Sequence, residues 1–277
     1  MAPVPSSVAR QAELLKADGN TYFKKERIGA AIDAYTEAIT LCPNVAVYRT
    51  NRALCYWKRK EWDRVEEDCR KAIELDSSSV KGHYMLGLAL LEHQDHSGGI
   101  KELEKAFDLE RGAHPTGYMV EEIWQTLSKA KYTDWERESN ERLWKYQNLK
   151  ESCEKALLEH NFLDVTESID EVKVSMAQHS EQLKLLEEVF SKAAKVDKPT
   201  EVPDYLCCKI TLDILRDPVI TPGGVTYERA VLLEHLQKVG NFDPITREAL
   251  DSHQLAPNLA IKEAVRAFLN DHGWAYK

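Results

Sequence analysis

The first residues whose side chains could bind a ligand are lysines and asparagines in the N-terminal third of the chain. Lys16 and Asn20 are four residues apart, so they share one face of a helix. Asn51 and Lys81 follow in two later helical segments. Ammonium and amide groups that converge from three helices can donate charge-assisted hydrogen bonds to carboxylates. The set predicts a receptor for the carboxylate end of an acidic peptide; the alternative is solvated lysines on an ordinary helix face.

The cysteines could serve a second kind of chemistry, metal binding or redox exchange. None of the six forms a CxxC pair, so the spacing of a structural zinc site is missing. We therefore expect free thiols, no metal and no other cofactor. The adjacent pair Cys207–Cys208 favours a structural place at the start of a strand over redox chemistry. The six positions are Cys42, Cys55, Cys69, Cys153, Cys207 and Cys208.

Charge and hydropathy exclude two classes of partner. The 277-residue chain carries a formal net charge of -9, which argues against general nucleic-acid binding because phosphates require a basic surface. No apolar run approaches the roughly 18 residues that a membrane-spanning helix needs. The N-terminal stretch MAPVPSSVAR contains no apolar run of signal-peptide length. We expect a cytoplasmic protein with no membrane partner, the nucleus being the alternative compartment.

The elements that position the lysines and asparagines follow a repeat of 34 residues. Small residues recur at two points of each unit, where they allow two antiparallel helices to approach closely. These positions are Gly19, Ala53 and Gly87, and then Ala38, Ala72 and Ala106. The spacing predicts three units at about 12–45, 46–79 and 80–113, within a repeat domain over 9–111 that follows a flexible N-terminus at 1–8. Stacked units form a concave groove, whose lining decides function.

The phrases LKADGN, YRTNRALCY and SVKGHYMLG resemble the tetratricopeptide repeats of co-chaperones. In that family such repeats hold the acidic C-terminal tails of cytosolic heat-shock chaperones. The resemblance implies that Tyr84 packs on an aliphatic side chain of the tail and that Glu122 replaces a family aspartate. Met85 stands where many of these repeats carry arginine, which argues against very tight or strictly selective binding. Three or four charge-assisted hydrogen bonds, less the cost of ordering the tail, predict roughly micromolar affinity. The implied carboxylate clamp consists of Lys16, Asn20, Asn51 and Lys81.

Residues 118–196 have the pattern of a charged helical hairpin with a turn around 160–168. Its apolar stripes are too narrow to form a core, so they need a partner. That partner is either the third repeat or a second copy of the chain, and family resemblance favours a homodimer. The two stripes are Leu143, Tyr146, Leu149, Cys153, Ala156 and Leu157, and Val172, Met176, Leu183, Leu186, Val189 and Phe190.

Residues 203–275 follow a proline-bounded linker and have a different pattern. PVITPGGVTY predicts a strand–turn–strand, and a last helix begins with Asn258 as its cap. The motifs DPVITPGGVTYER, NFDPITREAL and LAPNLAIKEAV resemble the U-box, the zinc-free relative of the RING. Polar pairs must then replace the zinc ions of a RING. The candidates are Asp217, Glu228, His235, Arg247 and Asn258, with a fold-supporting role preferred for His235 over a catalytic one.

The U-box resemblance implies ubiquitin transfer without a covalent intermediate on this chain. A ubiquitin-conjugating enzyme would dock on Ile210, Leu212 and Pro244, with Arg247 at the edge of the groove. The family often has an aromatic residue at the position of Leu212, so the choice among conjugating enzymes is expected to differ. For Ile210 the alternative is an ordinary place in the core of its loop.

The order of domains resembles the chaperone-associated U-box ligases over nearly the whole chain. It implies a mainly α fold: a superhelix of three tetratricopeptide repeats, a helical hairpin and a small α+β U-box. It also implies a co-chaperone that directs ubiquitin onto chaperone-bound misfolded clients for proteasomal degradation. Two alternatives remain open: a clamp-bearing adaptor whose U-box has lost ligase competence, and a repeat scaffold that does not recognise chaperone tails.

Overall fold

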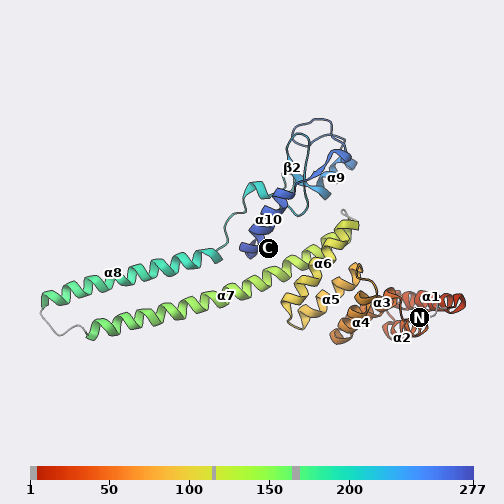
Figure 1. Cartoon of the computed structure of the whole chain (residues 1–277), viewed down its shortest axis with the longest axis horizontal. Helices are drawn as coiled ribbons and strands as arrows, with labels where there is room; N and C mark the ends of the chain where they lie inside the picture. The colour runs from red at the N-terminus through yellow and green to blue at the C-terminus, as the bar shows by residue number, and fades with distance from the viewer. Residues whose placement is uncertain (1–4, 114–116, 164–168) are drawn as a thin grey trace. The chain divides into compact units, whose positions relative to one another are not determined.

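The computed structural model describes residues 5–113, 117–163 and 169–277 and is mainly helical, with one small sheet (Figure 1). The predicted fold class is therefore confirmed. The chain divides into two compact units, Met1–Ala130 and Lys131–Lys277. No helix in the described part of the chain is both long and apolar enough to cross a membrane.

The first unit consists of three helix pairs followed by the beginning of a long helix, α7 (Tyr118–Leu163). The start of α7 covers the third pair, where Ile123 and Leu127 pack in one core cluster with Leu103 and Phe107. The helices of the three pairs are α1 (Ser6–Lys24), α2 (Ile28–Leu41), α3 (Ala46–Lys58), α4 (Trp62–Leu75), α5 (Val80–Glu92) and α6 (His96–Ala113).

The 34-residue spacing corresponds to close helix contacts in this unit. A Cβ atom on Gly19 would lie 2.6 Å from Cε1 of Tyr35, and one on Gly87 would lie 2.8 Å from Cγ of Leu103. Neither site accommodates a larger residue without movement of its neighbour. The turn inside each pair also repeats, because one residue per turn adopts a left-handed backbone at the same spacing. These residues are Glu26, Lys60 and Gln94, with φ values of 58°, 59° and 63°.

The helix α1 begins at Ser6, inside the segment 1–8 that was expected to be flexible. Residues 1–4 of that segment lie outside the described part of the chain. The cause of this early start is apolar packing, since Val8 packs against the buried cluster that contains Ala12 and Tyr48. The amide of Val8 also donates to the carbonyl of Pro5 at 3.0 Å.

The second unit begins with the rest of α7, which forms a hairpin with α8 (Ile169–Ala194) and the short helix η1 (Lys195–Asp197). Because α7 continues to Leu163, the helix extends into the region expected to be a turn. The side chains at Val172 and Met176, part of the second predicted stripe, lie outside the described residues. Several large apolar side chains of the hairpin are exposed to solvent: Leu143, Trp144, Leu149, Leu158, Leu185 and Val189.

The C-terminal part of this unit is built on a three-stranded antiparallel sheet of order β2-β1-β3. The predicted strand–turn–strand and the final helix are confirmed, whereas β3 was not predicted because it has only two residues. Val219 pairs with Tyr227 on one side and with Pro257 on the other. The elements are η2 (Asp204–Leu206), β1 (Pro218–Ile220), β2 (Thr226–Glu228), α9 (Arg229–Lys238), η3 (Ser252–Gln254), β3 (Ala256–Pro257), α10 (Leu259–Asp271) and η4 (Gly273–Tyr276).

The last residues of the chain pack on α7 within the second unit. The Lys131 ammonium donates to the Tyr276 hydroxyl at 3.0 Å, and the Lys277 ammonium lies over the ring of Tyr132. Gly273 is buried against Trp135, whose Cγ would be 2.5 Å from an added Cβ atom. The segment after α10 therefore joins the small sheet domain to the hairpin.

Candidate functional site

Three of the four predicted clamp residues form a continuous chain of hydrogen bonds across α1, α3 and α5. The Asn51 amide donates to the Asn20 side-chain oxygen at 3.3 Å, and the Lys81 ammonium donates to the Asn51 side-chain oxygen at 3.0 Å. The Tyr35 hydroxyl fixes Asn20 from behind with a bond of 2.7 Å. Residues that are far apart in the sequence thus present ammonium and amide donors together.

Lys16 lies one helical turn before Asn20 and is engaged by an acidic neighbour. Its ammonium pairs with the carboxylate of Glu13, which also accepts a hydrogen bond of 2.6 Å from the buried Tyr48 hydroxyl. The hydrogen bonds from Lys16 and then Tyr48 hold the pKa of the Glu13 carboxyl below its usual value. A carboxylate ligand would compete with Glu13 for Lys16. Sequence reasoning missed Glu13, although its i, i+3 spacing from Lys16 was visible.

Lys81 has a different environment, because no carboxylate of the described residues is its partner. Burial lowers the pKa of its ammonium group. Burial also raises the pKa of the Cys55 thiol to about 11 and of the Cys69 thiol to about 12, so both favour the neutral form. Among the described residues Lys81 makes no ion pair. A half-buried ammonium bonded only to an amide is a favourable place for an incoming carboxylate.

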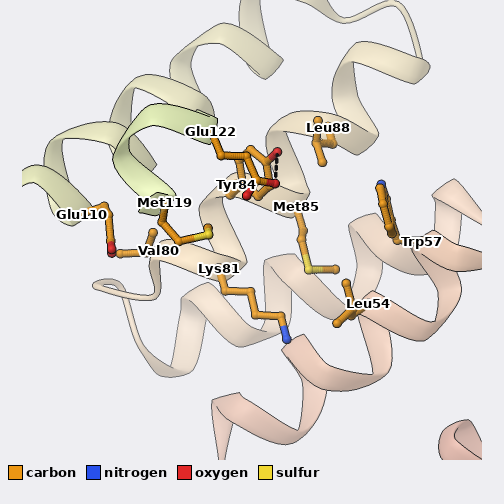
Figure 2. Close-up of a pocket in the computed structure, with 10 residues that line it drawn as sticks. All are labelled: Leu54, Trp57, Val80, Lys81, Tyr84, Met85, Leu88, Glu110, Met119 and Glu122. Carbon is orange, nitrogen blue, oxygen red and sulfur yellow. Dashed lines mark hydrogen bonds between the residues drawn. The ribbon is translucent and has the colours of Figure 1, made fainter. Parts of the chain in front are cut away.

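An apolar cavity of about 460 Å³ lies next to Lys81 (Figure 2). Tyr84 and Glu122, both predicted tail contacts, line it and are joined by a hydrogen bond of 3.2 Å from the Tyr84 hydroxyl to Glu122 Oε1. Lys16, Asn20 and Asn51 are not among its lining residues. The complete lining is Leu54, Trp57, Val80, Lys81, Tyr84, Met85, Leu88, Glu110, Met119 and Glu122.

Several cavity residues were not singled out from the sequence. Leu54 and Trp57 follow Asn51 at helical spacing on α3, and Leu88 follows Tyr84 by one turn on α5. That spacing was a usable signal, because residues three or four apart lie on the same helix face. Met85 is buried and contributes an apolar wall to the cavity. A ligand that binds the ammonium and amide donors could place an apolar side chain here.

The second predicted site consists of two loops that flank the small sheet. Ile210 and Leu212 have exposed fractions of 40% and 75%, so Ile210 is not the buried loop residue of the alternative interpretation. Leu212 has a left-handed backbone with φ of 63°. On the second loop, Pro244 is half-buried and its neighbour Ile245, which sequence reasoning missed, is 54% exposed. Both loops present apolar side chains to solvent, as a docking surface requires.

A buried carboxylate organises the second loop. Asp243 is 2% exposed and accepts hydrogen bonds from the Tyr227 hydroxyl at 2.7 Å and the Thr221 hydroxyl at 3.0 Å. It also accepts from the backbone amides of Ile245 and Thr246, at 2.8 and 3.0 Å. Burial alone would raise the pKa of Asp243, but these hydrogen bonds, with Tyr227 first, bring it below the usual value. The network fixes the loop that carries Pro244 and Arg247.

The predicted substitutes for zinc form local pairs rather than one cluster. Asp217 binds Arg229 at 2.7 Å, and the Glu228 carboxylate accepts from the backbone amides of Arg216 and Asp217. Burial raises the pKa of the Glu228 carboxyl despite these bonds. No group of three or more potential metal ligands is arranged around a common point in the described residues.

Three further predicted residues support the second loop and the last helix. His235 Nε2 lies 3.1 Å from the Phe242 carbonyl oxygen, and the two rings meet edge to face. The Arg247 guanidinium lies over the ring of Phe242, with 5.3 Å to its centroid. Asn258 caps α10, as predicted, by accepting from the Ile261 amide, and its own amide donates to Thr226 at 3.0 Å. These contacts favour structural roles for His235 and Asn258.

The vicinal cysteines have structural contacts. Cys207 pairs with Ile214 in an isolated β-bridge, and Cys208 is buried, with its sulfur accepting from the Glu228 amide at 3.4 Å. Burial raises the pKa of the Cys207 thiol, which disfavours the reactive thiolate. All six cysteines are free thiols. The structural interpretation therefore describes the pair better than redox chemistry does.

Comparison with known proteins identifies both kinds of domain. The U-box domain family matches residues 202–274, and the tetratricopeptide repeat family matches residues 19–45. The E3 ubiquitin-protein ligase CHIP of Arabidopsis thaliana is 62% identical over 274 residues, which cover 99% of this chain and 99% of the relative. The RNA polymerase II-associated protein 3 of Homo sapiens is 32% identical over 43% of this chain and 18% of its own length.

Two solved tetratricopeptide-repeat structures are similar to part of this chain. The TPR2B domain of yeast Sti1, in a complex with pHsp70, is 29% identical, covers 44% of this chain and 96% of its own, and has a TM-score of 0.41. The first TPR of Spaghetti bound to the HSP90 peptide SRMEEVD is 31% identical, covers 43% and 94% of the two chains, and has a TM-score of 0.38.

Proposed function

The chain belongs to the CHIP family of U-box E3 ubiquitin-protein ligases, and we propose that it couples this activity to capture of acidic peptide tails. Its tail ligands would be the C-terminal ends of cytosolic heat-shock chaperones. The observation that carries the proposal is the hydrogen-bonded set of Asn20, Asn51 and Lys81, on the same chain as the U-box. The set offers donors to a carboxylate, and Lys16 adds a second ammonium group.

The ligase acts by positioning and forms no covalent intermediate with ubiquitin. A conjugating enzyme carries ubiquitin as a thioester, and the acceptor lysine of the client attacks that bond. The docked U-box raises the effective concentration of the thioester near the acceptor and restricts its orientation. We propose that Ile210, Leu212 and Pro244 contact the conjugating enzyme and that Arg247 contacts it at the edge. The exposure of Ile210 and Leu212 and the support of the second loop by Asp243 favour this assignment.

On the tail, the terminal carboxylate would bind the amides of Asn20 and Asn51 and the Lys16 ammonium, with Glu13 displaced. An acidic side chain nearby would bind Lys81. The next apolar side chain would enter the cavity beside Tyr84 and Met85. Charge-assisted hydrogen bonds contribute about 1.5–3 kcal/mol each, and ordering of a flexible tail removes about 2–5 kcal/mol, so roughly micromolar affinity follows. Such affinity suffices, because tethering makes the later encounter with the client intramolecular.

A reconstituted ubiquitination assay tests the coupling of the two functions. The substrate is a lysine-rich model client fused to an acidic tail with a free carboxy end, and its control lacks the tail. Wild type should ubiquitinate the tailed client faster, Lys16→Ala should lose this preference, and Ile210→Ala should lose activity on both. Equal modification of both clients by wild type would contradict tail capture. Self-ubiquitination that Ile210→Ala leaves unchanged would contradict the docking assignment.

We also propose that the α7–α8 hairpin mediates a homodimer. Trp144, Leu149, Leu185 and Val189 are each more than half exposed, and an apolar face of this kind needs a partner. Sedimentation velocity should show twice the monomer mass for wild type. It should show a monomer for a variant with Leu149→Glu and Val189→Glu. A monomeric wild type at micromolar concentration would exclude the dimer.

We propose the cytoplasm as the place of action, with the nucleus as the alternative. The six free thiols fit a reducing compartment. Fractionation of cells that express a tagged chain would test this, and recovery from a membrane-enclosed oxidising compartment would contradict it.

A further inference from the structure

The cavity beside Tyr84 is lined mainly by apolar residues, but it carries a positive charge at one end and negative charges at the other. Lys81 belongs to the hydrogen-bonded clamp and also lines the cavity, so it marks the end that faces the clamp. Glu110 from α6 and Glu122 from α7 are the acidic lining residues. In Figure 2 the Lys81 side chain extends away from both glutamates. A bound chain that runs from the clamp through the cavity therefore meets carboxylates on leaving it.

The two carboxylates can still accept hydrogen bonds from a ligand or form ion pairs with it. The side chain of Glu110 makes no hydrogen bond or ion pair with the described residues. Glu122 accepts one bond, at Oε1, from the Tyr84 hydroxyl, and this bond orients its carboxylate at the cavity wall. Among the described residues, Lys81 makes no ion pair with Glu110 or Glu122, so the positive and negative ends of the cavity stay available to a ligand.

We propose that Glu110 and Glu122 make this cavity selective for tails with a basic residue immediately before the apolar residue that fills it. The inference rests on the proposed tail capture and specifies its ligand class. In an extended chain consecutive residues are about 3.3–3.6 Å apart, so the preceding side chain can reach the cavity rim while the apolar one stays inside. A basic side chain there would pair with the glutamates, and an acidic one would be repelled.

Three synthetic peptides that differ at one position test this selectivity by fluorescence anisotropy with the full-length chain. They are SRMEEVD, SQMEEVD and SEMEEVD, each with a free carboxy end. An exposed ion pair contributes about 0.2–1 kcal/mol. Because the two carboxylates attract the arginine of one peptide and repel the glutamate of the other, the arginine peptide should bind about tenfold more tightly than the glutamate peptide. The glutamine peptide should fall between them. Added salt should reduce the difference, because these charges are partly exposed.

The variants separate this inference from the clamp itself. In a double variant with Glu110→Gln and Glu122→Gln, the affinities for the three peptides should converge within about twofold. Glu92→Gln, on an exposed part of α5 outside the cavity, should keep the wild-type preference. Equal affinities for wild type, or an unchanged preference in the double variant, would overturn the selectivity and leave the clamp intact. Failure of all three peptides to bind wild type would overturn the clamp as well.

Discussion

The Lys81 ammonium donates a 3.0 Å hydrogen bond to the side-chain oxygen of Asn51. This bond joins the first helices of the second and third repeats, and the same Asn51 side chain continues to Asn20 in the first repeat. All three repeats therefore contribute to one donor surface, so the full set of three is needed to form it.

Lys81→Met should weaken binding of an acidic peptide by at least about 30-fold, because loss of a half-buried charged partner costs about 2–5 kcal/mol. Methionine preserves the apolar part of the side chain. Lys71→Met is the matched control, since Lys71 is exposed on α4 and pairs with Glu67. Isothermal titration calorimetry measures both. Equal affinity of the Lys81 variant and wild type would remove Lys81 from the site.

Ile210→Ala should reduce discharge of ubiquitin from the conjugating enzyme by about tenfold or more, since a buried apolar contact of this size is worth about 1.5–3 kcal/mol. The fold should persist, because Ile210 is 40% exposed in the free chain. Val47→Ala serves as the control, being 46% exposed on α3 in the other unit. A single-turnover discharge assay gives the rates. A normal rate with Ile210→Ala would place the docking surface elsewhere.

Asp243→Asn should destabilise the U-box by about 1–3 kcal/mol, because one buried oxygen would no longer match the donors from Tyr227, Thr221 and two amides. The pKa of Asp243 is lower in the folded state, so its stabilisation is present above the unfolded pKa of about 3.9 and is lost as the pH falls through the folded pKa. Scanning calorimetry from pH 6 to pH 3 should show a smaller acid-induced loss in the variant. Parallel losses in both proteins would contradict this role.

Gly19→Ala and Gly29→Ala should have opposite effects on repeat stability. An added Cβ at Gly19 meets the Tyr35 ring at 2.6 Å, whereas nothing lies within 4 Å of one at Gly29. The first should cost about 1–3 kcal/mol through overpacking, and the second should add about 0.5 kcal/mol through reduced backbone freedom. Urea unfolding followed by circular dichroism compares them. Destabilisation of similar size in both would show that contact with Tyr35 is not the cause.

Gly273→Ala should loosen the C-terminal segment from α7, because the new methyl group would collide with Trp135. The expected cost is about 1–3 kcal/mol. Hydrogen exchange of the last residues should rise, since the Lys131–Tyr276 bond depends on this packing. Trp135→Leu in the same chain should make the alanine tolerable. If the double variant is as unstable as the sum of the two single variants, Trp135 is not the obstacle.

The repeat register and the capping of the last helix could be predicted because both depend on local rules. Each repeat needs a small residue where its two helices approach closely, as at Gly19 and Gly87, so the spacing of these residues is visible along the chain. Asn258 caps α10 through an amide only three residues away. The short strand β3 was not predicted because its two residues form a strand only by pairing with β1, which is distant in the sequence.

The sequence by itself determined the two domain types, the mainly α class and the residues that could donate hydrogen bonds to a carboxylate. Only the tertiary structure decided which groups meet in space. Glu13 forms an ion pair with Lys16, Asp243 accepts hydrogen bonds from the second loop, and Glu110 lines the cavity. The physical reason is that periodicity reports which face of a helix is buried, whereas a hydrogen bond or an ion pair requires two specific atoms to meet. Those meetings arise from packing of segments far apart in the chain.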